Sequence, residues 1–202
     1  MSGPMTGAVV LAAGKSVRMG KPKMGLPWGD TTVIGQVVAT LVGAGLDEVV
    51  VVTGGGREEV EQALGCLPQE WTVRAIFNPD FAAGEMLSSI QTGVTALGKS
   101  CEAALIALGD QPQIEADVVR TILETYYQSG ASLVIPSYAM RRGHPMLIAR
   151  PLWAGLLALR SPQTLRELVQ AHQGEIVHVS VDTPSILQDL DTPDDYHRFK
   201  PG

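Results

Sequence analysis

Positive side chains are concentrated in one short stretch near the start of this chain. Four cationic side chains fall within nine residues: Lys15, Arg18, Lys21 and Lys23. The stretch follows an apolar run at 8–11 that predicts a buried strand, and Gly14 and Gly20 interrupt it. Such a loop can bring backbone N–H groups and positive charge to one anion. A polyphosphate is the ligand that this chemistry favours.

Two widespread phosphate-binding motifs do not fit this loop. A Walker A motif, G-x-x-x-x-G-K-[ST], would end at Gly14-Lys15-Ser16, but Val9 stands where its first glycine belongs. Gly20-Lys21 is followed by proline rather than by Ser or Thr. The Rossmann pattern G-x-G-x-x-G is also missing after this strand. The loop is therefore basic and glycine-containing, but it belongs to neither class.

Asp110 is the strongest single candidate for a metal ligand. It comes two residues after an apolar run at 103–108 and stands between Gly109 and Gln111-Pro112. Magnesium prefers carboxylate and phosphate oxygens and keeps several of its waters. We therefore expect Asp110 to hold Mg²⁺ beside a bound polyphosphate.

A second group of acidic residues lies near the C-terminus. Thr192 predicts a helix N-cap, Pro193 suits the first helical position, and Asp195 can complete a capping box. Asp189 and Asp191 precede the cap, so capping does not explain them. Either of them can supply a second metal ligand, and we prefer Asp191.

Apolar runs alternate with amphipathic helical patterns along the chain. Strands are predicted at 8–11, 49–52, 73–77, 103–108, 133–135 and 175–181. Helices are predicted from 33 to a stop at Gly45, at 87–97, from 118 to Gly130, and near 151–159 and 162–172. Segment 137–148 predicts a β-hairpin with an antiparallel edge strand. The alternation indicates one α/β domain over residues 1–202, a Rossmann-like three-layer sandwich with a mainly parallel sheet.

The unusual loop residues all follow predicted strands. They stand at 14–23, 53–56, 78–80 and 109–112. Because open parallel sheets bind ligands outside the carboxyl ends of their strands, we expect these four loops to meet at one edge.

Composition narrows the classes of function. A net charge of −6 argues against a nucleic-acid-binding protein. The chain has no apolar run of membrane-spanning length and no apparent signal region, which predicts a cytoplasmic protein without a membrane partner. Cys66 and Cys101 are far apart and lack zinc-ligand spacing, so we expect free thiols.

Four sequence signatures resemble those of the molybdenum cofactor nucleotidyltransferases, and most closely the cytidylyltransferase branch. They are Leu-Ala-Ala-Gly-x-Ser-x-Arg-Met-Gly-x-x-Lys at 11–23, Gly-Asp-Gln-Pro at 109–112, Arg-Gly-His-Pro at 142–145 and Asp-x-Asp-Thr-Pro-x-Asp-Tyr at 189–196. The resemblance implies a fold of the nucleotide-diphospho-sugar transferase type. It also implies Mg²⁺-dependent transfer of a nucleotide from a nucleoside triphosphate to the phosphate of molybdopterin, with release of pyrophosphate. A molybdoenzyme would receive the product.

The resemblance further implies roles for residues of this sequence. The nucleotide would be held by the backbone of Leu11, Ala12, Ala13 and Gly14, and its base and ribose would lie near Asn78, Ser88 and Ser89. Arg18 and Lys23 would grip the triphosphate, Asp110 and Asp191 would bind Mg²⁺, and His144 would face the acceptor.

The preferred base and the acceptor follow from smaller differences. The related guanylyltransferases carry glycine where this chain has Ala13, and the extra methyl group favours a pyrimidine, hence CTP. Met86 and Ser161-Pro162 depart from the family pattern, which leaves the acceptor open. The alternatives are a guanylyltransferase of the same family, a nucleotidyltransferase that uses a sugar or polyol phosphate, and a cofactor-delivery protein without chemistry.

Overall fold

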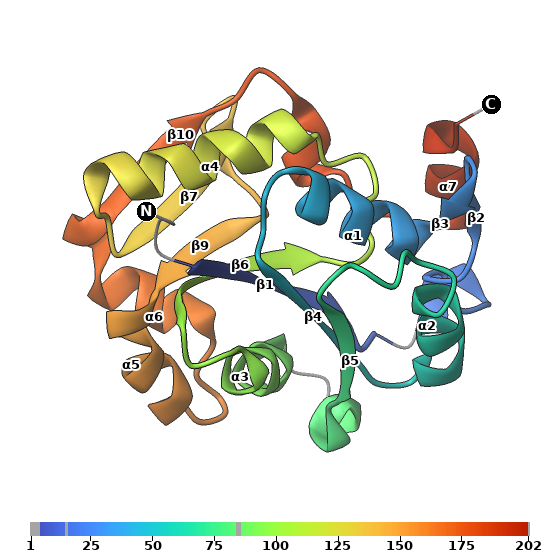
Figure 1. Cartoon of the computed structure of the whole chain (residues 1–202), viewed down its shortest axis with the longest axis horizontal. Helices are drawn as coiled ribbons and strands as arrows, with labels where there is room; N and C mark the ends of the chain where they lie inside the picture. The colour runs from blue at the N-terminus through green and yellow to red at the C-terminus, as the bar shows by residue number, and fades with distance from the viewer. Residues whose placement is uncertain (1–4, 15, 84–85, 202) are drawn as a thin grey trace.

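A central β-sheet separates two layers of helices (Figure 1). The computed structural model describes residues 5–14, 16–83 and 86–201. In spatial order the strands are β10 (Ile176–Ser180), β7 (Leu133–Tyr138), β9 (Met146–Ala149), β6 (Cys101–Leu108), β1 (Met5–Ala12), β4 (Glu48–Thr53) and β5 (Val73–Phe77), and β8 (Arg141–Arg142) pairs with β7. This order confirms the predicted α/β class.

Parallel pairing joins the strands that carry the unusual loops. β1 pairs in parallel with β4 and with β6, and β4 pairs in parallel with β5. The carboxyl ends of all four strands therefore lie at one edge of the sheet, as the sequence predicts.

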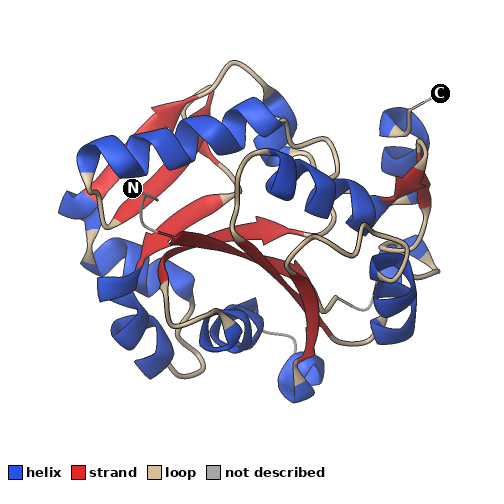
Figure 2. Ribbon diagram, in the orientation of Figure 1, coloured by secondary structure: helices blue, strands red, loops and turns tan. Residues whose placement is uncertain are grey.

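Helices cover both faces of the sheet (Figure 2). One layer contains α1 (Val33–Gly43), α2 (Arg57–Leu64) and α4 (Ala116–Ser129); the other contains α3 (Met86–Ala96), α5 (Trp153–Ala158) and α6 (Leu165–Ala171). The alternation of side chains along a strand explains why one sequence supplies both layers. In β4, Val49 and Val51 pack in the first core, whereas Val50 and Val52 pack in the second.

A small third cluster fixes the C-terminal segment beside the start of the chain. The hairpin of β2 (Pro27–Trp28) and β3 (Thr31–Thr32) lies next to α7 (Pro193–Phe199) in Figure 1. Trp28, Leu190 and Tyr196 are buried together there, and the Tyr196 hydroxyl donates to the carbonyl of Pro27 at 2.6 Å. This packing places residues 189–191 near the loop that follows β1.

Two details differ from the sequence-based expectations. The predicted hairpin at 137–148 is present, but its antiparallel strand β9 lies between β6 and β7 rather than at an edge. Leu147, Ile148 and Ala149 of β9 are apolar and buried, which suits a strand covered on both faces. Helix α6 begins at Leu165 rather than near residue 162, because Thr164 and Glu167 form a capping box.

Both cysteines are free thiols, as expected, and only Cys101 belongs to the core. Burial, aided by the neighbouring Glu48 carboxylate, raises the pKa of the Cys101 thiol to about 11. Among the residues described, no helix combines the length and apolar character needed to cross a bilayer.

Mutation of Gly93 tests whether α3 packs closely against the sheet. A β-carbon built at Gly93 would lie 2.2 Å from Val9 Cγ1 and 3.0 Å from Val52 Cγ2. Gly93→Ala should therefore lower the free energy of unfolding by about 1–3 kcal/mol, measured by urea denaturation. Gly43→Ala is the matched control, because Gly43 is also helical and its β-carbon would meet nothing within 4 Å. That control should be neutral or stabilising by up to about 1 kcal/mol. Equal effects of the two changes would contradict this account of α3 packing.

Candidate active site

A cleft of about 550 Å³ opens at the carboxyl edge of the sheet, where the loops after β1 and β6 meet the start of α3 and the acidic segment 189–191. Its charged lining comes from the beginning, the middle and the end of the sequence: Arg18, Lys23, Asp110, Asp189 and Asp191. The rest of the lining is largely apolar and includes Leu11, Met24, Phe81, Met86 and Leu108. The cleft therefore combines a cluster of charged side chains with a largely apolar remainder.

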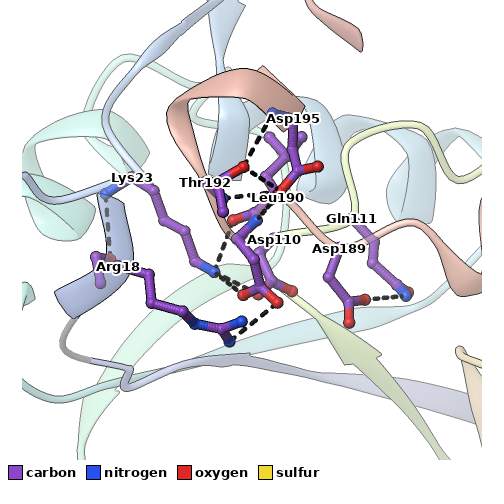
Figure 3. Close-up of polar contacts among 10 residues, drawn as sticks. Arg18, Lys23, Asp110, Gln111, Asp189, Leu190, Thr192 and Asp195 are labelled. Atoms are coloured by element: carbon purple, nitrogen blue, oxygen red, sulfur yellow. Dashed lines mark hydrogen bonds and ion pairs between the residues drawn. The ribbon is translucent and has the colours of Figure 1, made fainter. Parts of the chain in front are cut away.

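Lys23 is the centre of the charged cluster. Its side chain is only 9% exposed, and its ammonium nitrogen lies 2.6 Å from Asp110 Oδ2 and 3.5 Å from Asp191 Oδ1 (Figure 3). It also donates to the carbonyl of Leu190 at 2.9 Å. An ammonium group has three N–H donors, so all three have acceptors within the protein. The two carboxylates thus converge on one positive charge.

Arg18 joins the same cluster from the surface. Its guanidinium Nη2 lies 3.0 Å from Asp191 Oδ2, and its side chain is 71% exposed. Figure 3 shows Arg18 and Lys23 pointing to the region of Asp110 from the same side. The early cations and the later carboxylates are therefore brought together, as the sequence predicts.

Local structure explains how the acidic segment is held. Leu190 is fully buried in the third cluster, while its backbone N–H donates to the carbonyl of Asp110 at 2.9 Å. The predicted capping box is present, since Thr192 Oγ1 accepts from the N–H of Asp195, and Asp195 Oδ2 accepts from that of Thr192 at 2.8 Å. Asp195 Oδ2 also accepts from the N–H of Asp191 at 3.2 Å. A buried leucine and a helix cap thereby fix the backbone on both sides of Asp191.

Asp189 occupies a different environment from Asp191. Gln111 Nε2 donates to Asp189 Oδ1 at 2.7 Å, and both lie on the far side of Asp110 from Lys23 in Figure 3. Burial raises the pKa of the Asp189 carboxyl, and the charges of Asp110 and Asp191 add to this effect. Asp191, which contacts both cations, is the carboxylate that shares a partner with Asp110.

This donor set suits a magnesium ion. The Asp110 and Asp191 carboxylates approach one point closely enough to share the Lys23 ammonium. Within the described ranges no group of three or more His, Cys, Asp or Glu side chains is placed to bind a metal. Mg²⁺ is commonly held by one or two carboxylates together with substrate phosphates and water, so two carboxylates are enough.

The end of β1 and the residues directly after it border the cleft. Leu11, Ala13 and Gly14 line the cleft, whereas the Ala12 side chain is buried in the first core on the other face of the strand. Only the main chain of Ala12 can therefore reach a ligand. Lys15, which the sequence places in the basic loop, lies outside the described residues.

Of the residues expected beside the base and ribose, Ser89 lines the cleft. Asn78 is 1% exposed and lies behind it, where its amide nitrogen donates to the hydroxyls of Ser88 and Ser89, at 3.0 Å each. Ser88 lines a separate groove beside β5. Asn78 thus ties the end of β5 to the start of α3, and its reach to a nucleotide stays a prediction.

His144 is not among the residues that line the cleft. Its N–H donates to the carbonyl of Ile186 at 3.1 Å, and its side-chain Nε2 is buried without a partner among the described residues. Burial lowers the pKa of its imidazole, and the charge of Asp110 opposes this shift. Burial therefore favours the neutral form of the imidazole, and its contact with an acceptor stays a prediction.

Sequence reasoning missed two features of the cleft. Phe81 is one of the apolar lining residues and packs closely against Gly54, where a β-carbon would come within 2.7 Å of Phe81 Cβ. The adjacent glycines after β4 are the only local signal for this contact. Gln111 stands within the Gly-Asp-Gln-Pro motif. Its bond to Asp189 could not be predicted, because the two residues are distant in sequence.

Comparison with known proteins places this geometry in a family. The sequence matches the family described as the MobA-like NTP transferase domain over residues 8–177. The chain is 28% identical over 188 residues to the molybdenum cofactor cytidylyltransferase of Escherichia coli (strain K12), covering 93% of this chain and 92% of that protein.

Two solved structures resemble the fold closely. A nucleotidyl transferase from Methanothermobacter thermautotroptrophicus has a TM-score of 0.81 and 30% identity, with coverage of 98% of this chain and 97% of that one. The manganese complex of Rv0371C from Mycobacterium tuberculosis H37Rv has a TM-score of 0.76 and 27% identity, with 98% of each chain covered. With cations and carboxylates gathered at the carboxyl edge of the sheet, this chain belongs to the MobA-like NTP transferase family and is a nucleotidyltransferase.

Proposed function

We propose that this nucleotidyltransferase transfers CMP from CTP to the terminal phosphate of molybdopterin, in a Mg²⁺-dependent reaction that releases pyrophosphate. The observation that carries the proposal is the meeting of Arg18 and Lys23 with Asp110 and Asp191 in one cleft. The full-length similarity to a molybdenum cofactor cytidylyltransferase supports the choice of base and acceptor.

The proposed step is an in-line displacement at phosphorus. An oxygen of the acceptor phosphate forms a bond to the α-phosphorus of CTP, and the bond from that phosphorus to the α,β-bridging oxygen breaks. Pyrophosphate leaves with the bonding electron pair, and the product is a phosphoanhydride. Since the attacking phosphate is already an anion, no side chain has to remove a proton from a hydroxyl nucleophile.

The residues of this chain act mainly by electrostatic stabilisation. Arg18 is exposed enough to reach the β- and γ-phosphates, where negative charge accumulates as pyrophosphate departs. Asp110 and Asp191 would hold Mg²⁺, which when bound neutralises phosphate charge and orients the triphosphate. Lys23 compensates the charge of both carboxylates, and its contact with the triphosphate, which the family resemblance implies, stays a prediction.

The shape of the cleft supports CTP as the donor. Ala13 lines the cleft directly after β1, and its methyl group would take up space that a glycine would leave for a larger base. One methyl group is typically worth about 10–200-fold in discrimination, so the preference for a pyrimidine should be measurable but finite.

A pyrophosphate-release assay with CTP, GTP, ATP and UTP, each with and without molybdopterin, tests the proposal directly. We expect release only with Mg²⁺ and molybdopterin, fastest with CTP by roughly 10-fold or more over GTP. CTP should also raise the melting temperature more than GTP does at equal concentration.

Other outcomes identify the alternatives. Pyrophosphate release that is faster with GTP than with CTP would indicate a guanylyltransferase. Equal increases in melting temperature with CTP and GTP would contradict the argument that Ala13 favours a pyrimidine. Release that requires a sugar or polyol phosphate would overturn the molybdopterin acceptor. Binding without release by any acceptor would indicate cofactor delivery and contradict the proposed reaction.

Asp110→Asn should remove most turnover and leave the fold intact. The amide keeps the size of the side chain but loses the charge that would hold Mg²⁺, so we expect kcat to fall by roughly 10²–10³-fold. Asp117→Asn is the matched control, because Asp117 is exposed on α4 and outside the cleft. Undiminished Mg²⁺-dependent turnover by Asp110→Asn would rule out the metal role.

Arg18→Ala should chiefly weaken nucleotide binding. Loss of a charged hydrogen bond to a phosphate predicts a rise of roughly 10-fold in KM for CTP, measured by steady-state kinetics. Arg120→Ala, on the surface of α4, provides a control for the loss of one positive charge. A KM for CTP that stays at the wild-type value would argue against the triphosphate contact.

A further inference from the structure

Gln111 is a buried polar residue directly beside the candidate metal ligand. It follows Asp110 in the loop after β6 and is 2% exposed. Its backbone is fixed on both sides, since its N–H donates to the carbonyl of Leu108 at 3.3 Å and its carbonyl accepts from Ile114 at 3.2 Å. The backbone hydrogen bonds therefore fix the position from which the Gln111 side chain extends.

The side-chain amide of Gln111 makes two contacts with the acidic segment. Its Nε2 donates to Asp189 Oδ1 at 2.7 Å and to the carbonyl of Ile186 at 3.3 Å. Both partners are acceptors, so only the NH₂ group can face them, and the orientation of the amide follows from the contacts. One side chain thus bonds the chain at two points, the carbonyl of Ile186 and the carboxylate of Asp189.

The backbone of Asp110 holds the same segment one residue further along. Its carbonyl accepts from the N–H of Leu190 at 2.9 Å. Residues 110 and 111 therefore attach the segment 186–190 to the end of β6 through three hydrogen bonds. The position of Asp191 relative to Asp110 depends on this attachment, because Asp191 is the next residue in the chain.

We propose that Gln111 is a positioning residue, which acts through segment 186–191 to set the separation of the Asp110 and Asp191 carboxylates. The inference rests on the proposed function, in which these two carboxylates hold the metal. Gln111 also holds the Asp189 carboxylate on the far side of Asp110 from Lys23 (Figure 3). Without that donor, Asp189 can rotate its charge toward Asp110 and Asp191, and like charges repel.

The test replaces the amide without changing the length of the side chain. Gln111→Met in the full chain removes the donor and keeps an unbranched side chain of similar volume. Gln113→Met is the matched control, because both amide atoms of Gln113 are buried and have no hydrogen-bond partner among the residues that the structure describes. Mn²⁺ binding is titrated by electron paramagnetic resonance, without nucleotide or acceptor.

We expect Gln111→Met to weaken Mn²⁺ binding by roughly 10–100-fold, and Gln113→Met to bind like the wild type. The Mg²⁺ concentration for half-maximal turnover should rise by a similar factor, while turnover at saturating Mg²⁺ stays near the wild-type value. A purely structural role would instead lower the melting temperature and leave the Mn²⁺ affinity of the folded protein unchanged, which would overturn the proposal.

Asp110→Asn and Asp191→Asn separate this inference from the proposed function. If both weaken Mn²⁺ binding and Gln111→Met does not, the positioning role is wrong and the metal site stands. If neither weakens Mn²⁺ binding, the proposed metal site itself is wrong. Should Gln111→Met fail to fold, Gln111→Leu removes the same donor with a shorter apolar side chain and leaves the Asp189 charge in place. It must then weaken Mn²⁺ binding by a comparable factor, and unchanged binding would overturn the proposal.

Discussion

The compensation of two carboxylates by one nearly buried ammonium group is the interaction on which the site depends. Lys23 bonds Asp110, Asp191 and the carbonyl of Leu190, and so joins the first loop, the loop after β6 and the C-terminal segment. Two carboxylates at this separation would repel each other without a cation between them. A bound divalent ion would likewise lie between the carboxylates and the negative charges of a triphosphate, so positive and negative groups would alternate through the site.

Much of the fold follows from local sequence patterns. The β-branched run in β4, the stop of α4 at Gly130 and the capping box of Thr192 and Asp195 depend on residues a few positions apart. The placement of the loops at one edge follows from the alternation of strands and helices. The position of β9 inside the sheet does not, because four apolar residues fit an edge or an interior strand equally well.

The site could be predicted as a set of residues but not as a set of contacts. The sequence alone shows the types and the order of Arg18, Lys23, Asp110 and Asp191. That Lys23 turns inward, that Asn78 lies behind Ser89 and that Gln111 bonds Asp189 depend on the packing of segments up to 167 residues apart. Such contacts depend on tertiary structure, so they cannot be predicted from a short stretch of sequence.

The burial of Leu190 between two aspartates has a consequence for the dynamics of the molecule. Its side chain packs among Met19, Trp28 and Tyr196, so docking of α7 helps to hold the acidic segment, together with the hydrogen bonds from residues 110 and 111. Fraying of the last helix would withdraw Asp191 and the Leu190 carbonyl from Lys23 together. Ligand binding at the cleft and protection of the C-terminal amides from solvent exchange are therefore thermodynamically linked, although α7 does not line the cleft.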